Sequence, residues 1–292
     1  MSSRLLLLAA AASLICACAG EASPGTSDGA AAHDASPSLD GPRPDRDAGG
    51  GQKDASNPGD TGPAPDAAGS SSGGSGGAYP GKQTRQATVG TTSFSYHLYL
   101  PKAYDPGKAR PLLSVFHGQG DTGANMRDYW APVAESNGFI VLATTSTGTS
   151  GGWSGATDPP RYEAALNDAL KAYNIDTSRL YVWGFSAGAH LVHALALMNA
   201  DLFAAYAVNA GVLAAFAGTN APASALRKIP VSIRIGDADP MVGQARQDRD
   251  RFKSAGWVEG QNLFYSEFPG GHQLPTGDRQ LAWDRMGKHK LP

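Results

Sequence analysis

Cysteine is nearly absent from this sequence of 292 residues, which contains only Cys16 and Cys18. The chain after Cys18 therefore has neither a disulfide nor a thiolate metal site, and a folded region must be stabilised by a buried core. A large excess of one charge is also missing, because the formal net charge is −2. This balance gives no indication of a nucleic-acid partner.

Aromatic residues are missing between Ala19 and Ala78, where Leu39 is the only large aliphatic side chain. Glycine, alanine, serine and proline make up most of this segment. Such a composition buries too little apolar surface to offset the entropy lost on ordering. The sequence therefore predicts a disordered linker that extends through residue 78.

The first 17 residues contain one basic residue, Arg4, and an apolar run too short to span a bilayer. This arrangement is typical of an export signal. The small residues before Cys18 also resemble a bacterial lipoprotein signal, which implies lipidation of Cys18. An ordinary cleaved signal is the alternative. Because Ala19 rather than aspartate follows Cys18, the resemblance implies an outer-membrane or cell-surface protein that contacts the membrane only through its lipid. If Cys18 is not lipidated, the expected protein is a secreted one.

From Tyr79 onward, short apolar runs alternate with helical patterns, which predicts one folded domain over residues 79–292. Thr92–Leu100 alternates as an antiparallel strand does. Further strands are expected over 111–116, 138–144, 180–183, 204–208, 231–235 and 263–268, with helices over 124–136, 161–173, 187–198, 244–254 and 278–288. This order indicates an α/β fold with a mainly parallel sheet and helices on both faces. Ligands bind such sheets at the carboxyl ends of the strands.

One strand end carries the pattern G-x-S-x-G. Residues 180–183 lead into Gly184, Phe185, Ser186, Ala187 and Gly188, after which a helix is expected. A tight strand-to-helix turn of this kind holds a serine hydroxyl clear of the sheet. The pattern therefore predicts Ser186 as a nucleophile.

Two later strand ends supply the base and the acid that a serine nucleophile needs. The strand over 263–268 leads to His272, and the strand over 231–235 leads to Asp237 and Asp239. The order serine, aspartate, histidine is that of α/β-hydrolases. His272 is the expected base, and Asp239 is the preferred acid, with Asp237 left as the alternative.

A fourth strand end provides the expected oxyanion hole. The sequence after residues 111–116 is His117, Gly118, Gln119 and Gly120. The backbone N–H groups of Gln119 and Ala187 are the predicted donors to the substrate oxygen. His117 is expected to be buried and to shape this loop rather than to act as a second base.

Together these stretches resemble one esterase family. HGQGDTGANM, GFIVLATT, IDTSRLYVWGFSAGAH, IGDADPMV and GGHQLP are similar to motifs of secreted polyhydroxybutyrate depolymerases, feruloyl esterases and acetylxylan esterases. The resemblance runs from Tyr79 to the end of the chain and implies the α/β-hydrolase fold. It also implies ester hydrolysis through an acyl-enzyme, with Ser186, Asp239 and His272 at the matching positions. The family often has a tryptophan at the position of Leu274. This departure leaves the acyl group of the substrate undetermined.

Other residues near these loops have less specific interpretations. Trp153 follows a strand end and is expected to contact substrate, with loop packing as the alternative. His190 and His193 are three residues apart on a helix, but no third ligand suggests a metal site. The aromatic residues assigned to packing are Tyr129, Trp130, Trp257 and Trp283. Residues 211–229 leave no room for a large lid, which indicates an open cleft.

The sequence therefore predicts a serine carboxylic-ester hydrolase that acts on an ester, polymeric or part of a cell wall, without a metal or cofactor. A serine peptidase of the same fold and a silent surface-binding module are the alternatives. Nothing in the sequence indicates an oligomeric state.

Overall fold

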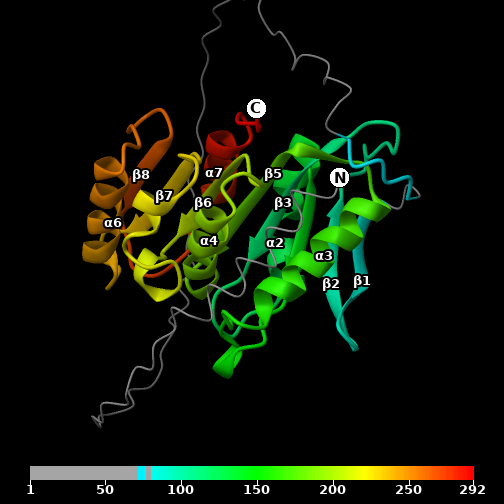
Figure 1. Cartoon of the computed structure of the whole chain (residues 1–292), viewed down its shortest axis with the longest axis horizontal. Coiled ribbons are helices and arrows are strands. Elements are labelled where there is room, and N and C mark those ends of the chain that lie inside the picture. Colours follow the sequence, from blue (N-terminus) through cyan, green and yellow to red (C-terminus); the bar gives the residue numbers. More distant parts are fainter. Residues whose placement is uncertain (1–70, 77–79) are drawn as a thin grey trace, which may run out of the picture. The chain divides into compact units, whose positions relative to one another are not determined.

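The computed structural model describes residues 71–76 and 80–292 (Figure 1). The predicted signal over residues 1–17, the anchor Cys18 and the linker up to residue 70 lie outside the described residues. No helix of the described part of the chain is long and apolar enough to cross a membrane.

One sheet organises the described residues, with its eight strands in the order β1-β2-β4-β3-β5-β6-β7-β8. The strands are β1 (Gly81–Val89), β2 (Thr92–Leu100), β3 (Arg110–Phe116), β4 (Ile140–Thr144), β5 (Ile175–Phe185), β6 (Ala205–Asn209), β7 (Val231–Gly236) and β8 (Leu263–Phe268). From β4 to β8 all neighbours are parallel, whereas β2 is antiparallel to both β1 and β4. The mainly parallel sheet expected from the sequence is confirmed.

Helices cover both faces of this sheet (Figure 1). Their bounds are α2 (Gly123–Asn137), α3 (Asp158–Ala172), α4 (Ala187–Met198), α6 (Val242–Ser254) and α7 (Asp278–Met286). Residues of α3, α4 and α6 share one core cluster with one side of the strands, and residues of α2 and α7 share the other. In β3, Leu112 belongs to the first cluster and Leu113 to the second, as the two-residue period of a strand requires.

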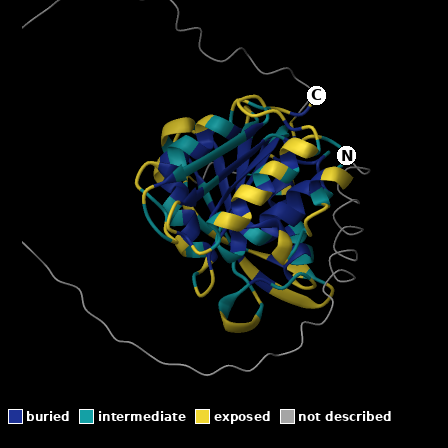
Figure 2. Ribbon diagram, turned by 90° about the vertical axis from the view of Figure 1, so that its left-hand side faces the viewer, coloured by how far each residue is buried: buried dark blue, intermediate teal, exposed yellow. Residues whose placement is uncertain are grey.

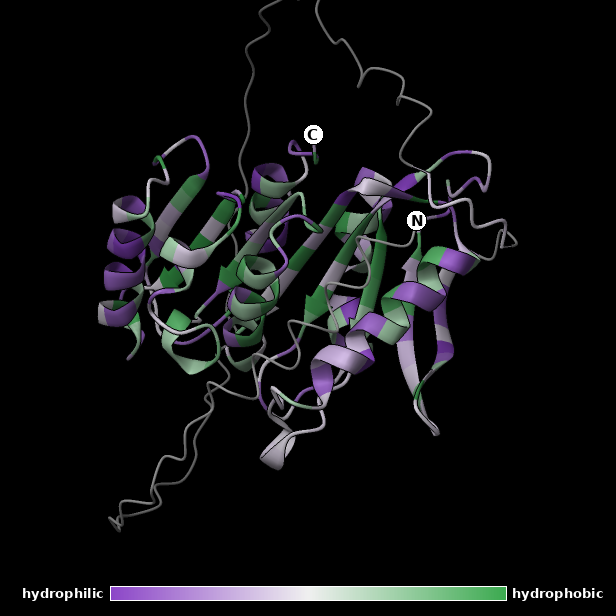
Figure 3. Cartoon of the chain, viewed as in Figure 1, coloured by the Kyte–Doolittle hydropathy of each residue, from purple (hydrophilic) through white to green (hydrophobic). Residues whose placement is uncertain are grey.

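The pattern of burial follows from these layers. Figure 2 shows buried strands between helices whose outward turns are exposed, and Figure 3 shows the apolar residues concentrated in the same strands. The aromatic residues assigned to packing are buried or nearly so: Trp130, Trp257 and Trp283 are each at most 9% exposed. Tyr129 is half-buried and stacks on Trp183.

Strand β1 is the element that the sequence did not predict. Ala87 is its only fully buried residue, and most of its other side chains are polar. It nevertheless pairs with β2 along its whole length. An edge strand with little apolar surface lacks the alternating pattern by which strands are recognised.

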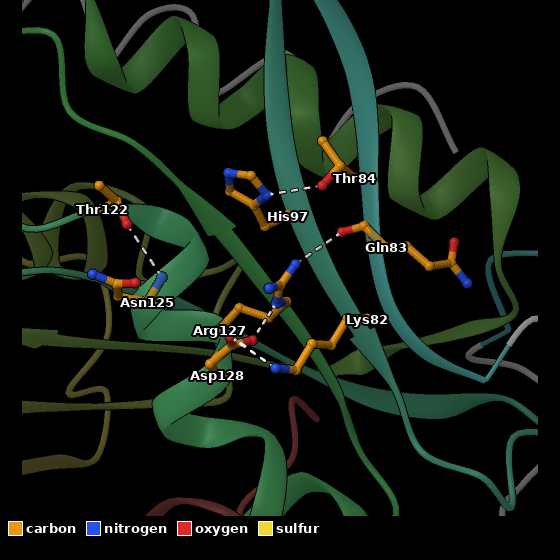
Figure 4. Close-up of polar contacts among 8 residues, drawn as sticks. All are labelled: Lys82, Gln83, Thr84, His97, Thr122, Asn125, Arg127 and Asp128. Atoms are coloured by element: carbon orange, nitrogen blue, oxygen red, sulfur yellow. Dashed lines mark hydrogen bonds and ion pairs between the residues drawn. The ribbon is translucent and has the colours of Figure 1, made fainter.

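Polar contacts attach α2 to the β1–β2 hairpin (Figure 4). Lys82 forms an ion pair of 2.9 Å with Asp128, and Arg127 donates both to Asp128 at 2.7 Å and to a main-chain carbonyl of β1. At its start, α2 is capped by Thr122, whose hydroxyl accepts a hydrogen bond from the N–H of Asn125. This helix therefore begins at a fixed point directly after the loop that carries Gln119.

Residues 71–76, which the composition placed in the linker, lie against the start of β5. The N–H of Ser72 donates to the carbonyl of Ile175 at 2.8 Å, and its hydroxyl donates to the carbonyl of Tyr173 at 2.7 Å. A Cβ at Gly74 would lie 2.3 Å from the carbonyl oxygen of Tyr173, so only glycine permits this approach. These contacts are made largely with the backbone, and the lack of apolar side chains concealed them.

Between β6 and β7 the chain forms only the short turns η2 (Leu213–Ala215) and α5 (Ala221–Ser224). The expected absence of a large lid insertion is thus met in the part of the chain that the structure describes. This connection contributes helical segments of only three and four residues.

Candidate active site

Ser186 occupies a strained turn between β5 and α4. Its φ of 53° lies in the left-handed region, which side chains rarely adopt. The turn is held because the N–H of Ser186 donates to the carbonyl of Asn209 at 2.9 Å. A Cβ at Gly188 would lie 2.3 Å from the carbonyl oxygen of Phe116, and one at Gly184 would meet the carbonyl of Gly188 at 2.5 Å. Both flanking glycines are therefore required by close backbone approach.

The hydroxyl of Ser186 is the end of a chain of two short hydrogen bonds. Its Oγ lies 2.7 Å from Nε2 of His272, and Nδ1 of His272 lies 2.7 Å from Oδ2 of Asp239. The Asp239 side chain is completely buried, whereas that of His272 is 36% exposed. A buried carboxylate on Nδ1 fixes the imidazole tautomer that leaves Nε2 free to accept the serine proton.

The two aspartates that follow β7 have different partners. Oδ1 of Asp239 accepts the N–H of Met241 at 2.8 Å, which orients its other oxygen toward His272. Asp237 instead accepts the N–H of Gly270 at 3.0 Å and so ties the end of β7 to the loop that carries His272. The structure thus brings Asp239, and not Asp237, into contact with the imidazole.

The loop after β3 lies beside the serine. A Cβ built at Gly118 would come within 3.5 Å of the Cβ of Ser186, so Gly118 and the nucleophile turn are in contact. Within residues 71–76 and 80–292, the N–H groups of Gln119 and Ala187 have no hydrogen-bond acceptor. Ala187 is the first residue of α4, where the helix dipole adds partial positive charge. Two free donors therefore lie next to the Ser186 turn.

His117 is fully buried and holds this loop through both ring nitrogens. Nδ1 donates to the carbonyl of Gly118 at 2.7 Å, and Nε2 accepts the N–H of Ser146 at 3.1 Å. Burial lowers the pKa of His117, so the ring stays neutral and both contacts persist at neutral pH. The expectation that His117 shapes the loop is confirmed.

Trp153 is packed within its loop, as its packing alternative predicts. It is 7% exposed, and its ring packs against those of Phe116 and His117 at centroid distances of 5.1 and 4.7 Å. Its Nε1–H donates to the carbonyl of His117 at 2.9 Å. The indole is turned inward because its N–H has a hydrogen-bond acceptor there and its ring packs on two other rings.

The two histidines of α4 do not form a metal site. His190 accepts the N–H of Val212 at 2.9 Å, and His193 contacts the hydroxyl of Tyr206 at 3.2 Å. The described residues contain no group of three or more histidine, cysteine, aspartate or glutamate side chains that could hold a metal ion. Burial lowers the pKa of His190, and it lowers that of His193 to about 3.

His193 makes the stability of the domain sensitive to acid. Its pKa is about 3 in the folded chain and 6.5 in the unfolded one, so unfolding takes up a proton once the pH falls below 6.5. From pH 7 to pH 5 this group should cost about 2 kcal/mol of stability. The free energy of unfolding, measured in urea, should fall between pH 7 and pH 5 in both proteins. The fall should be smaller in His193→Asn than in the parent, by about 2 kcal/mol. Equal losses in the two proteins would contradict this assignment.

A buried polar network behind Ser186 was missed by the sequence analysis. Asn209, whose carbonyl binds the Ser186 N–H, donates through Nδ2 to Asp278 at 2.6 Å. Asp278 begins α7 and lies 2.5 Å from Arg234 of β7. Burial raises the pKa of Asp278 to about 6, against the lowering effect of Arg234. The sequence feature that could have indicated this network is a polar residue, Asn209 or Arg234, within a largely apolar strand.

The fold and these contacts define a protein of the α/β-hydrolase fold, with a serine, a histidine and an aspartate linked at the carboxyl ends of its strands. Solved structures similar to it include a CE1 ferulic acid esterase from Anaeromyces mucronatus in complex with ferulic acid. The TM-score is 0.58 at 16% identity, covering 71% of this chain and 89% of the other. The S954A mutant of a feruloyl esterase module from Clostridium thermocellum, complexed with sinapinate, has a TM-score of 0.57 at 17% identity, covering 69% and 85%.

Sequence comparison finds relatives over part of the chain. A bifunctional acetylxylan esterase/xylanase from Neocallimastix patriciarum is 30% identical over 39% of this chain and 17% of its own length. Feruloyl esterase B from Neurospora crassa is 30% identical over 44% of this chain and 47% of its own length. Poly(3-hydroxybutyrate) depolymerase from Ralstonia pickettii is 29% identical over 46% of this chain and 33% of its own length. The chain thus spans less than half the length of each of these curated relatives. The sequence profile of the prolyl oligopeptidase family matches residues 154–220.

Proposed function

We propose that this chain is a serine carboxylic-ester hydrolase. The observation that carries the proposal is the pair of 2.7 Å hydrogen bonds from Ser186 through His272 to Asp239. The similarity to esterases of three named specificities supports it. A hydroxyl needs an adjacent base to attack a carbonyl carbon, and this arrangement supplies one.

In the proposed reaction, Oγ of Ser186 attacks the ester carbonyl carbon while its proton passes to Nε2 of His272. The carbonyl oxygen becomes an oxyanion, which the N–H groups of Gln119 and Ala187 stabilise. When the bond to the leaving group breaks, His272 returns the proton to the departing alkoxide and the acyl-enzyme remains. Water then gives a proton to His272 and attacks the acyl carbon; when the bond from that carbon to Oγ breaks, His272 passes the proton to Oγ, which releases the acid and restores Ser186. Asp239 stabilises the imidazolium in both halves.

The substrate is proposed to be a polymeric or cell-wall ester. Two features of the site support a large substrate: His272 is 36% exposed, and no long insertion covers the strand ends between β6 and β7. The names of the relatives, which refer to acetylated xylan, feruloyl esters and poly(3-hydroxybutyrate), give the candidate ester types.

A serine peptidase is the second candidate, because the prolyl oligopeptidase profile matches the segment that contains Ser186. The same contacts would serve amide hydrolysis. The test is the full chain assayed on p-nitrophenyl acetate and butyrate beside peptide p-nitroanilides, with acetylated xylan, feruloylated arabinoxylan and polyhydroxybutyrate films as polymers. We expect turnover of the esters and none of the anilides. Anilide cleavage at a comparable rate would favour the peptidase, and no turnover of any substrate would favour the binding module.

We further propose export and lipidation at Cys18, on the basis of the N-terminal sequence. Metabolic labelling of the full chain with a tagged fatty acid tests this proposal. Label should be lost in Cys18→Ala and retained in Cys16→Ala, and an unlabelled parent would leave only a cleaved signal.

A further inference from the structure

A cavity of about 430 Å³ lies between the β1–β2 hairpin and the start of α3. Val89, Phe94 and Pro160 form an apolar wall, and Thr147, Thr157 and Arg161 supply polar groups. This volume falls in the usual range for small-molecule sites. The cavity therefore combines a flat apolar surface with hydroxyls and one cation.

The cavity is at the same edge of the sheet as Ser186. Strands β4 and β5 are both parallel to β3, so Thr147, which follows β4, and Ser186, which follows β5, lie at the same ends of the strands. The start of β2 lies there too, because Tyr96 of the antiparallel β2 is paired with Thr144, the last residue of β4. The loop after β4 also contacts the Gln119 loop, since the N–H of Gly120 donates to the carbonyl of Gly151 at 3.0 Å.

Arg161 is a cation without an anionic partner in the described ranges. Its Nε is buried there with no hydrogen-bond acceptor, and its guanidinium lies 4.2 Å from the centre of the Phe94 ring. The nearby carboxylate of Asp158 is already engaged, because it accepts hydrogen bonds from the N–H groups of Thr147 and Ser154 and from the Thr147 hydroxyl. A guanidinium that is held against an aromatic face and lines a cavity is suited to bind a carboxylate through its terminal N–H groups.

A second hollow of about 520 Å³ along β1 and α3 adjoins this cavity, because Val89 and Pro160 line both. Its walls are polar and include Gln86, Asn167 and Lys171, together with the carboxylates of Glu163 and Asp168. Amide and hydroxyl groups suit the hydroxyls of neutral sugars, whereas the acidic groups disfavour further negative charge. The cavity and the adjoining hollow, together called the groove, therefore favour a mostly neutral chain with its carboxylate at Arg161.

We propose that this groove binds the carbohydrate part of the ester substrate, with a carboxylate-bearing sugar, a uronic acid, against Arg161. The proposal rests on the proposed ester hydrolase and narrows its substrate to an acidic polysaccharide ester. The carboxylate pairs with the guanidinium, the apolar face of the pyranose packs on Val89 and Pro160, and threonine hydroxyls bind the ring hydroxyls. Arg161 is here a specificity residue that leaves the acyl chemistry unchanged.

Binding is tested without turnover, by calorimetry on the full chain carrying Ser186→Ala. The probes are a xylo-oligosaccharide with one glucuronic acid side group and the same oligosaccharide without it. We expect Arg161→Gln to weaken binding of the acidic probe about 10- to 100-fold, as for loss of a charge-assisted hydrogen bond, and to leave the neutral probe unchanged. Arg161→Lys should restore part of the loss. Lys253→Gln, an exposed cation of α6, is the matched control and should change neither.

Activity provides the second readout. With Ser186 intact, Arg161→Gln should raise KM for an acetylated acidic oligosaccharide and leave kcat/KM for p-nitrophenyl acetate within about twofold. Equal binding of the acidic probe by the parent and Arg161→Gln, or an equal loss for both probes, would overturn the groove proposal. If p-nitrophenyl esters are not hydrolysed at all, the esterase proposal fails, and the calorimetry still decides whether the groove binds the acidic sugar.

Discussion

Ser186→Ala is expected to lower kcat on p-nitrophenyl acetate by about 10⁶, which corresponds to roughly 8 kcal/mol of transition-state stabilisation. The reason is geometric: Oγ is the atom 2.7 Å from Nε2 of His272, and alanine leaves the base with nothing to activate. KM should change little, because the removed atom forms its bond with substrate only during the reaction.

The control for this substitution is Ser254→Ala on the exposed surface of α6, which should retain full activity. Circular dichroism and thermal unfolding of both variants show whether the fold is kept. A fluorophosphonate probe should label the parent and not Ser186→Ala. Retention of activity within about tenfold in folded Ser186→Ala would exclude Ser186 as the nucleophile.

Asp239→Asn is expected to lower kcat by about 10⁴, the effect typical of an acid-to-amide change in such a site. The amide would present an N–H to Nδ1 of His272, which favours the opposite tautomer and places a hydrogen on Nε2. The imidazole then donates to Ser186 instead of accepting from it. The geometry is retained, so the loss should appear in kcat measured across pH 6 to 9 with normal unfolding behaviour.

Asp237→Asn provides the matched comparison, because Asp237 precedes Asp239 by two residues and serves only the loop. Its amide oxygen can still accept the N–H of Gly270, so its kcat should stay within about tenfold of the parent. If Asp237→Asn proves the more damaging of the two, the acid has been assigned to the wrong residue.

The sequence predicts this site well where a residue type is tied to the end of a strand. Ser186, His272 and the pair Asp237 and Asp239 each lie in the loop that follows a predicted strand, and parallel strands bring their carboxyl ends together. The sequence already favours Asp239 over Asp237, and the structure adds the contacts that separate them, because Asp239 binds His272 and the N–H of Met241 whereas Asp237 binds the loop.

Other features depend on long-range packing that no local pattern encodes. Trp153 is turned inward by a carbonyl 36 residues away, and Asp278 lies beside Asn209 across 69 residues. The cavity at Arg161 exists because a hairpin tip formed partly by the unpredicted β1 faces the start of α3. Strand β1 has almost no apolar signal, so neither it nor the groove along it could be inferred from periodicity.

Residues 71–76 have a consequence for the direction in which the site faces. They are joined to the amino end of β5, whereas Ser186 follows its carboxyl end, and the stretch of β3 that pairs with β5, Arg110 to Phe116, spans roughly 20 Å at about 3.3 Å per residue. Ser71 is therefore on the far side of the domain from the nucleophile. Residues 71–76 thus lie at the amino ends of the strands and take no part in the edge of the sheet that carries Ser186.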